Sequence, residues 1–182
     1  DKRAARLALG EAAPANEPPR QVTIYVAAAK PERIAWLVEK ATEIGVAAIR
    51  FVPTEREARA MESSQLARLR RIAISAVEQS GRSLVPQLVL EDGLREAIAG
   101  ARAAGAKLAV LDSSGVPAGA RLGEAGRCGL LVGPEGGWSP GERDLFRSAE
   151  VPVASLGPTV LRVETAALVA AGLALLGGGL SR

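Results

Sequence analysis

Residues 128–140 read CGLLVGPEGGWSP, an apolar run that leads into a loop of glycine and proline and then into a helix start. The run Cys128–Val132 is short and bounded by glycines, which is typical of a buried strand. Glycines in the loop 133–137 permit backbone conformations closed to other residues and let a ligand approach the main chain closely. The stretch therefore predicts a buried strand followed by a candidate ligand loop.

A strong helix start follows this loop. Ser139, Pro140 and Glu142 suit the N-cap, N1 and N3 positions, and we expect the helix to run to about Ala149. No Gly-Lys-Ser/Thr follows, so the loop is not a P-loop, and its spacing differs from the Rossmann G-x-G-x-x-G. Taken alone, it fits either an ordinary strand–helix connection or a ligand site of another class.

A second stretch of the same kind occupies residues 151–167, VPVASLGPTVLRVETAA. Val151–Leu156 is expected to be a short strand, and a helix opens after the glycine and proline that end it. Helix N-termini offer free N–H groups and a positive dipole end to polar ligands, although Glu164 could simply cap the helix and Arg162 could simply pair with Glu164 or Glu135. In open α/β sheets, ligands bind at such loops, so we expect the functional site here.

The rest of the chain alternates strands and helices. We expect strands at Gln21–Ala28, Ala48–Val52, Gln87–Leu90 and Lys107–Leu111, and helices at Pro31–Ile44, Glu62–Ser80 and Leu94–Ala104. Asp112–Gly115 should close the fourth of these strands as a third candidate ligand loop. This alternation predicts an α/β domain with a mostly parallel sheet and helices on both faces. We expect the domain to cover residues 21–182, because residues 1–20 are rich in proline and read as a linker.

The composition excludes several classes of site. The 182 residues contain no histidine and one cysteine, Cys128, which excludes histidine-based catalysis, an internal disulfide and His or Cys metal sites. No signal peptide is visible, and the longest apolar run, Ala166–Leu176, is too short to span a bilayer. We therefore expect a cytoplasmic protein with no metal and no membrane partner. A net charge of +3 permits an RNA partner without requiring one.

Arginines gather in the middle of the chain, namely Arg50, Arg56, Arg59, Arg68, Arg70, Arg71 and Arg82. Arginine binds phosphates bidentately and stacks on bases, but a run of charge is more often only a solvated face. Aromatic residues make up 3% of the chain, so no stacking platform for single-stranded RNA is evident. Residues 166–176 are almost continuously apolar, and a helix that is apolar all round must be buried on all sides. In a domain of this size, that pattern predicts a partner subunit.

Several of these segments together resemble the trefoil-knotted (SPOUT) methyltransferases. The motifs that carry the likeness are GPEGG at 133–137, LG at 156–157, LRVETA at 161–166, WLVEKATEIGV at 36–46 and EQSGR at 78–82. Within that class the chain resembles the family that methylates N3 of a uridine in 16S ribosomal RNA. The likeness covers roughly residues 20–178. It departs from the family at Thr159, where Arg is common, and at Val163, where Thr is common.

The resemblance implies S-adenosylmethionine as cofactor, 16S rRNA in the 30S subunit as partner, a homodimer and a C-terminal trefoil knot at residues 130–178. The cofactor residues that it implies are Leu111, Asp112, Leu131, Val132, Gly133, Pro134, Glu135, Gly136, Gly137, Leu156, Gly157, Leu161, Arg162, Thr165 and Ala166. We expect RNA contacts from Gln79, Arg82, Arg56 and Arg59. Family members usually carry an N-terminal barrel that resembles an RNA-binding PUA domain, and at most Lys2–Leu9 corresponds to its last strand.

The expected reaction must remove a proton from uracil N3. Because the chain has no histidine, a carboxylate must accept the proton or a cation must stabilise the forming anion. We expect Arg162 to be the cation and Glu164 or Glu135 the base, unless water serves. Two rival functions stay open: a knotted methyltransferase that acts on a ribose 2′-hydroxyl, and a non-catalytic RNA-binding module of the same fold.

Overall fold

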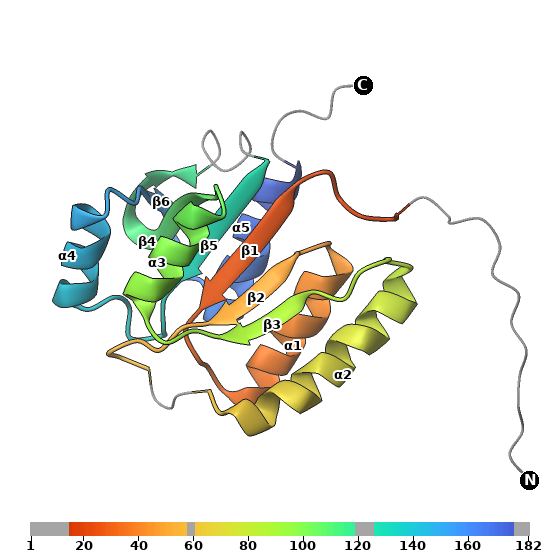
Figure 1. Ribbon diagram of the computed structural model, residues 1–182. Coiled ribbons are helices and arrows are strands. Elements are labelled where there is room, and N and C mark those ends of the chain that lie inside the picture. The colour runs from red at the N-terminus through yellow and green to blue at the C-terminus, as the bar shows by residue number, and fades with distance from the viewer. Residues whose placement is uncertain (1–14, 58–60, 119–125, 177–182) are drawn as a thin grey trace, which may run out of the picture.

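A six-stranded parallel sheet organises the computed structural model, which describes residues 15–57, 61–118 and 126–176 (Figure 1). The strands lie in the order β3-β2-β1-β5-β4-β6, and every described pairing is parallel. They are β1 (Gln21–Val26), β2 (Ala48–Phe51), β3 (Gln87–Leu90), β4 (Lys107–Pro117), β5 (Arg127–Val132) and β6 (Val153–Ser155). The predicted α/β class and parallel sheet are confirmed.

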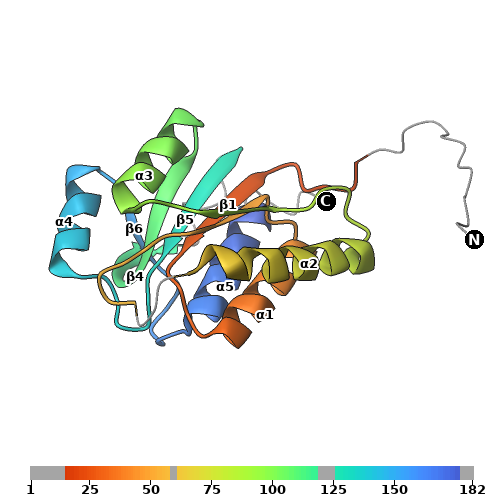
Figure 2. The ribbon, with the colours of Figure 1, turned by 60° about the horizontal axis from the view of Figure 1, so that its bottom comes forward.

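Helices cover both faces of this sheet, as the sequence predicted (Figure 2). They are α1 (Pro31–Glu43), α2 (Ser63–Ser80), α3 (Leu94–Ala103), α4 (Pro140–Ser148) and α5 (Val163–Leu176). α1, α2 and α5 pack on one face, while α3 and α4 pack on the other. Successive side chains of a strand point to opposite faces, so Leu130 and Val132 of β5 join the first core and Leu131 joins the second.

The α1 helix shows how sequence pattern becomes packing. Ile34, Leu37, Val38 and Ala41 recur at helical spacing, and the structure buries all four against the sheet and α5. Pro31 opens the helix at its first turn, where a missing N–H group costs no hydrogen bond. Burying an aliphatic side chain of this size contributes about 1.5–3 kcal/mol, so this stripe fixes α1 against α2 and α5 on its face of the sheet.

Strand β4 corrects one expectation. Asp112–Gly115 does not end the strand, because β4 continues to Pro117 through an irregularity in its pairing with β6. Leu111 and Val116 both pair with Ala154, so the intervening residues bulge outward. The Asp112 carboxylate accepts hydrogen bonds from the backbone and hydroxyl of Ser114, which stabilises this turn within the strand.

Two further expectations change in detail. Strand β6 is shorter than predicted, since Pro152 cannot donate to a ladder. Residues 15–20 are not a free linker, because Glu17 accepts hydrogen bonds from the backbone of Ser83 and Leu84. The suggested strand Lys2–Leu9 lies outside the described residues.

Helix α5 is not buried on all sides by its own chain. Its inner side packs on α1, β1 and β5, but Val169, Leu173 and Leu176 are exposed. The side that its own chain leaves exposed is the side for which the sequence predicts a partner subunit, and the homodimer and the knot stay predictions. None of the described helices combines the length and apolar character that a membrane span requires.

Candidate functional site

A pocket of about 470 Å³ lies at the carboxyl ends of β5 and β6 and beside the bulge in β4, where the two glycine-rich loops meet as expected. Most residues that the sequence singled out for a cofactor line it: Leu111, Asp112, Val132, Gly133, Pro134, Glu135, Gly137, Leu156, Gly157, Leu161, Arg162 and Ala166. Much of this lining is glycine, proline and small apolar side chains. The wall therefore presents main-chain groups that suit a ligand held by its shape and by backbone hydrogen bonds.

Three expected cofactor residues do not line this pocket. Leu131 is fully buried in the core on the other face of the sheet. A Cβ on Gly136 would face Arg56 rather than the pocket, and Thr165 lies in the first turn of α5 outside the lining. The alternation of side chains along β5 could have predicted the position of Leu131. Val132 faces the pocket, so its neighbour Leu131 must point to the opposite face of the sheet.

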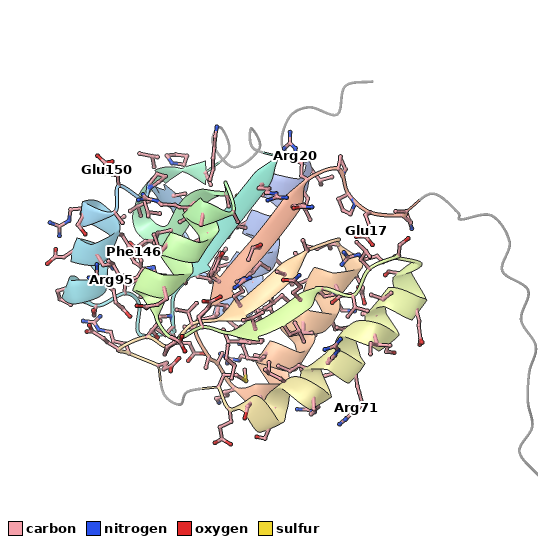
Figure 3. The ribbon with its side chains drawn as sticks, in the orientation of Figure 1. Glu17, Arg20, Arg71, Arg95, Phe146 and Glu150 are labelled. Carbon is pink, nitrogen blue, oxygen red and sulfur yellow. The ribbon has the colours of Figure 1, made fainter. Side chains whose placement is uncertain are left out.

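Trp138 ties two walls of the pocket together and was missed by sequence reasoning. Its indole Nε1 donates a hydrogen bond to the carbonyl oxygen of Leu111 at 3.1 Å. Its ring meets Phe146 edge-on, with centroids 4.8 Å apart, and Phe146 projects from α4 toward α3 (Figure 3). A Cβ on Gly133 would lie 2.8 Å from this indole. Glycine is therefore required at 133 for the loop to close over Trp138.

The predicted helix start at Ser139 is confirmed. Ser139 Oγ accepts from the Glu142 backbone at 3.0 Å, and Glu142 Oε2 accepts from the Ser139 backbone at 2.7 Å. Glu142 is buried and its other oxygen accepts from the Glu55 backbone at 3.0 Å. Arg56 adds a hydrogen bond to the Gly136 carbonyl at 3.1 Å. The loop after β2 thus holds the loop after β5 in place.

Asp112 carries a fixed negative charge on one wall of the pocket. Burial alone would raise its pKa, but hydrogen bonds from Ser114 and the nearby Arg143 guanidinium outweigh burial and hold the pKa below its usual value. Arg143 Nη2 lies 2.8 Å from Asp112 Oδ2. Asp112 is therefore ionised at neutral pH, and its charge is already paired within the chain.

A second charged group stands at the mouth of the pocket and joins three elements. Arg33, in the first turn of α1, makes an ion pair with Glu135 and lies 3.8 Å from Glu164. The simple alternative, in which Arg162 pairs with Glu135 or Glu164, is not observed. Arg162 is exposed and makes no ion pair with any described residue, so its charge is available to a ligand.

Arg33 is the charged residue of the pocket that sequence reasoning overlooked. It lines the pocket although it lies about a hundred residues before the glycine-rich loops. Its position in the sequence could have predicted this. Arg33 lies in the first turn of the helix that follows β1, and such helices begin at the carboxyl edge of a parallel sheet, where ligands bind. Glu164 is nearly buried, with a side chain 10% exposed, while Glu135 is 59% exposed.

The expected RNA contacts fall in different places. Arg82 and Gln79 lie at the end of α2 that is far from the pocket, and Arg82 is 5% exposed and paired with Glu17. Arg56 is exposed beside the pocket loop, and Arg59 lies outside the described residues. The fixed bonds of Arg82 give it a structural role. Sequence spacing could not show this, because Glu17 is distant in the chain.

Helix α2 instead carries the available positive charge. Arg68, Arg70 and Arg71 are exposed and make no ion pair with any residue that the structure describes. Arg71 points away from the helix into solvent (Figure 3). Within the described ranges, no group of three or more His, Cys, Asp or Glu side chains could hold a metal ion.

Comparisons with known proteins agree on one family. A family model for an RNA methyltransferase domain matches residues 16–175. The ribosomal RNA small subunit methyltransferase E of Mycobacterium bovis is 34% identical over 172 residues, which cover 87% of this chain and 63% of that protein. The protein of the same name from Aquifex aeolicus is 30% identical, with 91% and 73% covered.

Solved structures lead to the same group. The small subunit methyltransferase E of Neisseria gonorrhoeae, bound to S-adenosyl methionine, matches with a TM-score of 0.79 and 30% identity over 90% of this chain and 69% of that one. A Legionella pneumophila methyltransferase in complex with the same cofactor gives 0.79 and 31%, with 91% and 69% covered. An RNA 2′-O ribose methyltransferase at 16% identity shares the fold alone.

The chain spans about 63% of the length of the first curated relatives that it matches. The matched residues include both glycine-rich loops and the helices that hold them. The chain therefore belongs to the RNA methyltransferase family, within the group of ribosomal RNA small subunit methyltransferase E proteins.

Proposed function

We propose that this chain transfers the methyl group of S-adenosylmethionine to N3 of a uridine, position 1498, in 16S ribosomal RNA of the small ribosomal subunit. The observation that carries the proposal is the pocket built by the loops around Leu111, Gly133 and Gly157. The similar proteins from Neisseria gonorrhoeae and Legionella pneumophila hold S-adenosylmethionine. Because this chain keeps the fold and both loops, the same cofactor is the natural occupant.

The residues of the pocket fit this cofactor. Gly133 lines the pocket and packs closely on Trp138, so a larger side chain there would collide with the indole. A volume of about 470 Å³ lies within the range of small-molecule sites. When bound, S-adenosylmethionine supplies a methyl group already activated by its sulfonium. The chain's task is then to hold the ligand, exclude water and prepare the nucleophile.

Arg162 and a carboxylate would prepare uracil N3. The unpaired guanidinium of Arg162 can stabilise the negative charge that develops on the uracil as its N3 proton leaves. Glu135 is better exposed than Glu164 to accept that proton, directly or through water. The methyl group would then take the place of the N3 proton, which passes to the carboxylate, and the demethylated thioether S-adenosylhomocysteine would be the leaving group. Glu164, the other candidate base, is nearly buried and suits a supporting role at Arg33.

The RNA would approach across the α2 side of the pocket. Arg56 lies beside the pocket loop, and Arg68, Arg70 and Arg71 offer unpaired charges that can bind phosphates. We place the reaction in the cytoplasm, on 30S subunits. Residues 21–182 would form the catalytic unit.

A homodimer would cover the exposed stripe of α5. Val169, Leu173 and Leu176 lie on one side of an otherwise apolar helix, and burying such side chains against a second copy is favourable. A second copy would also explain why the helix is apolar almost all round. Sedimentation of the purified chain checks this, and a monomer at micromolar concentration would contradict it.

Two measurements test the function. The first is calorimetric titration of the 182-residue chain with S-adenosylmethionine and with its demethylated product; we expect binding at about one site per chain. The second is methyl transfer to 30S subunits that lack the modification, followed by nucleoside analysis. We expect N3-methyluridine. A ribose 2′-O-methyl product would favour the rival enzyme, and the absence of cofactor binding would favour a non-catalytic RNA-binding module.

A further inference from the structure

Arg33 occupies a position between the two loops that form the pocket. Its guanidinium pairs with Glu135, on the loop between β5 and α4. The same side chain lies 3.8 Å from Glu164, in the first turn of α5. No other cation among the described residues forms an ion pair with either carboxylate. One side chain of α1 therefore connects both walls at the mouth of the pocket.

The contact with Glu164 is incomplete in this structure. Glu164 Oε2 is buried and has no hydrogen-bond partner among the described residues. The Nε atom of Arg33 is near enough to Oε1 for an ion pair but too far for a hydrogen bond. A buried carboxylate without donors is costly. Among the described residues, Arg33 therefore supplies the one positive charge that lies against this buried carboxylate.

We propose that Arg33 is a positioning residue of the methyl-transfer site, which sets the separation of the cofactor loops by engaging Glu135 and Glu164 together. This inference rests on the proposed function. Without Arg33, two carboxylates from opposite walls would face each other with no cation between them. Their repulsion would open the pocket mouth and leave Glu164 unpaired. Arg33 thereby acts on the cofactor through the loops.

Arginine suits this role better than lysine. A guanidinium is planar and presents five N–H donors, so it can serve two carboxylates at once. A lysine in the same place keeps the charge but offers a single ammonium. The inference therefore predicts that Arg33→Lys restores part of what Arg33→Ala loses, with neither variant equal to the wild type.

The test measures cofactor affinity and turnover in the full 182-residue chain. Arg33→Ala, Arg33→Lys and the control Arg147→Ala are titrated with S-adenosylmethionine, and kcat and KM for it are measured on undermethylated 30S subunits. Arg147 is an arginine of α4 with a side chain 78% exposed and paired only with Asp144, outside the pocket lining. Thermal unfolding without ligand shows whether each variant folds.

We expect Arg33→Ala to raise Kd and KM for S-adenosylmethionine on the order of tenfold, equivalent to about 1.4 kcal/mol, with a smaller change in kcat. The Kd and KM of Arg33→Lys should fall between those of Arg33→Ala and the wild type, and the values of Arg147→Ala should match the wild type. Lower thermal stability of Arg33→Ala with unchanged Kd and KM would overturn the inference and leave Arg33 only structural. Absence of binding by the wild-type chain would instead overturn the proposed function, and the inference with it.

Discussion

Arg82 lies near the amino ends of the strands, where its side chain is almost buried. All three nitrogens of its guanidinium donate hydrogen bonds. It pairs with Glu17 and donates to the carbonyl oxygens of Thr42 and Val46 at 2.9 and 3.0 Å. At the carboxyl ends, Arg162 is exposed at the pocket and pairs with no described residue. Both arginines lie in sequence motifs of the same family, yet they occupy opposite environments.

The difference in environment assigns Arg82 to the stability of the fold and Arg162 to the functional site. A cation that is buried and fully hydrogen-bonded contributes to the fold, and removing it leaves its partners without donors. An exposed cation without a partner contributes little to folding, but its charge is free to meet a ligand. Substitutions at the two ends should therefore change different measured quantities.

The largest effect is expected at Arg82. Arg82→Ala leaves a largely buried Glu17 carboxylate and two carbonyls without their donor, which should lower the free energy of unfolding by about 3 kcal/mol. Urea denaturation measures the loss. Below the unfolding transition, affinity for S-adenosylmethionine should be unchanged. A stability loss under about 1 kcal/mol would show that residues 15–20 do not anchor the fold.

Arg162→Ala should have the opposite profile. We expect kcat to fall on the order of a hundredfold, because an aligned charge at the reacting atom is lost. The free energy of unfolding should change by less than about 0.5 kcal/mol. Single-turnover methylation of 30S subunits checks the rate, with Arg162→Lys as the control that keeps the charge. Normal methyl transfer by Arg162→Ala would remove Arg162 from the mechanism.

Gly133→Ala should affect both quantities, because this glycine belongs to the pocket and to the core. The added Cβ would lie 2.8 Å from the Trp138 indole, and overpacking of this kind costs about 1–3 kcal/mol. We expect lower thermal stability together with weaker S-adenosylmethionine binding. Gly100→Ala is the matched control, because a Cβ there meets no atom within 4 Å. Equal behaviour of the two variants would contradict the close approach at Gly133.

The smallest effect is expected from Asp112→Asn and depends on pH. The folded pKa of Asp112 is depressed, so the carboxylate contributes stability above its unfolded pKa, about 3.9, and loses it as pH falls through the folded value. At pH 7 the variant should be less stable by under about 1 kcal/mol. Denaturation from pH 7 downward should show the difference shrinking below about pH 4, and a constant difference would exclude the ion pair as its source.

Local sequence pattern predicted most of the helices and strands, because hydrophobic spacing and capping depend only on residues that are close in the chain. The stripe of α1 and the capping box at Ser139 appear where the sequence placed them. The bulge in β4 was missed, since it depends on the pairing of Leu111 and Val116 with the same Ala154. The apolar pattern of α5 includes Val169, which faces outward in the single chain, so the local pattern alone could not show what covers that side.

For the site, the sequence identified both pocket loops but not their supports. Glycine permits, and proline imposes, backbone conformations that are typical of loops. The lining from Val132 to Gly137 was therefore largely predictable. Trp138 and Arg33 were missed because their roles depend on partners distant in the chain, the Leu111 carbonyl and the two glutamates. No local pattern distinguishes such residues from ordinary core or surface side chains.

The sequence by itself determined the α/β alternation, the two glycine-rich loops and the absence of histidine, because each depends only on residue type and order. The tertiary structure decided which charges meet. It paired Arg33 with Glu135 and Glu164, buried Arg82 against Glu17, and left Arg162 open at the pocket. The physical reason is that the strength and availability of a charge depend on burial and on nearby partners in space, which only the folded chain brings together.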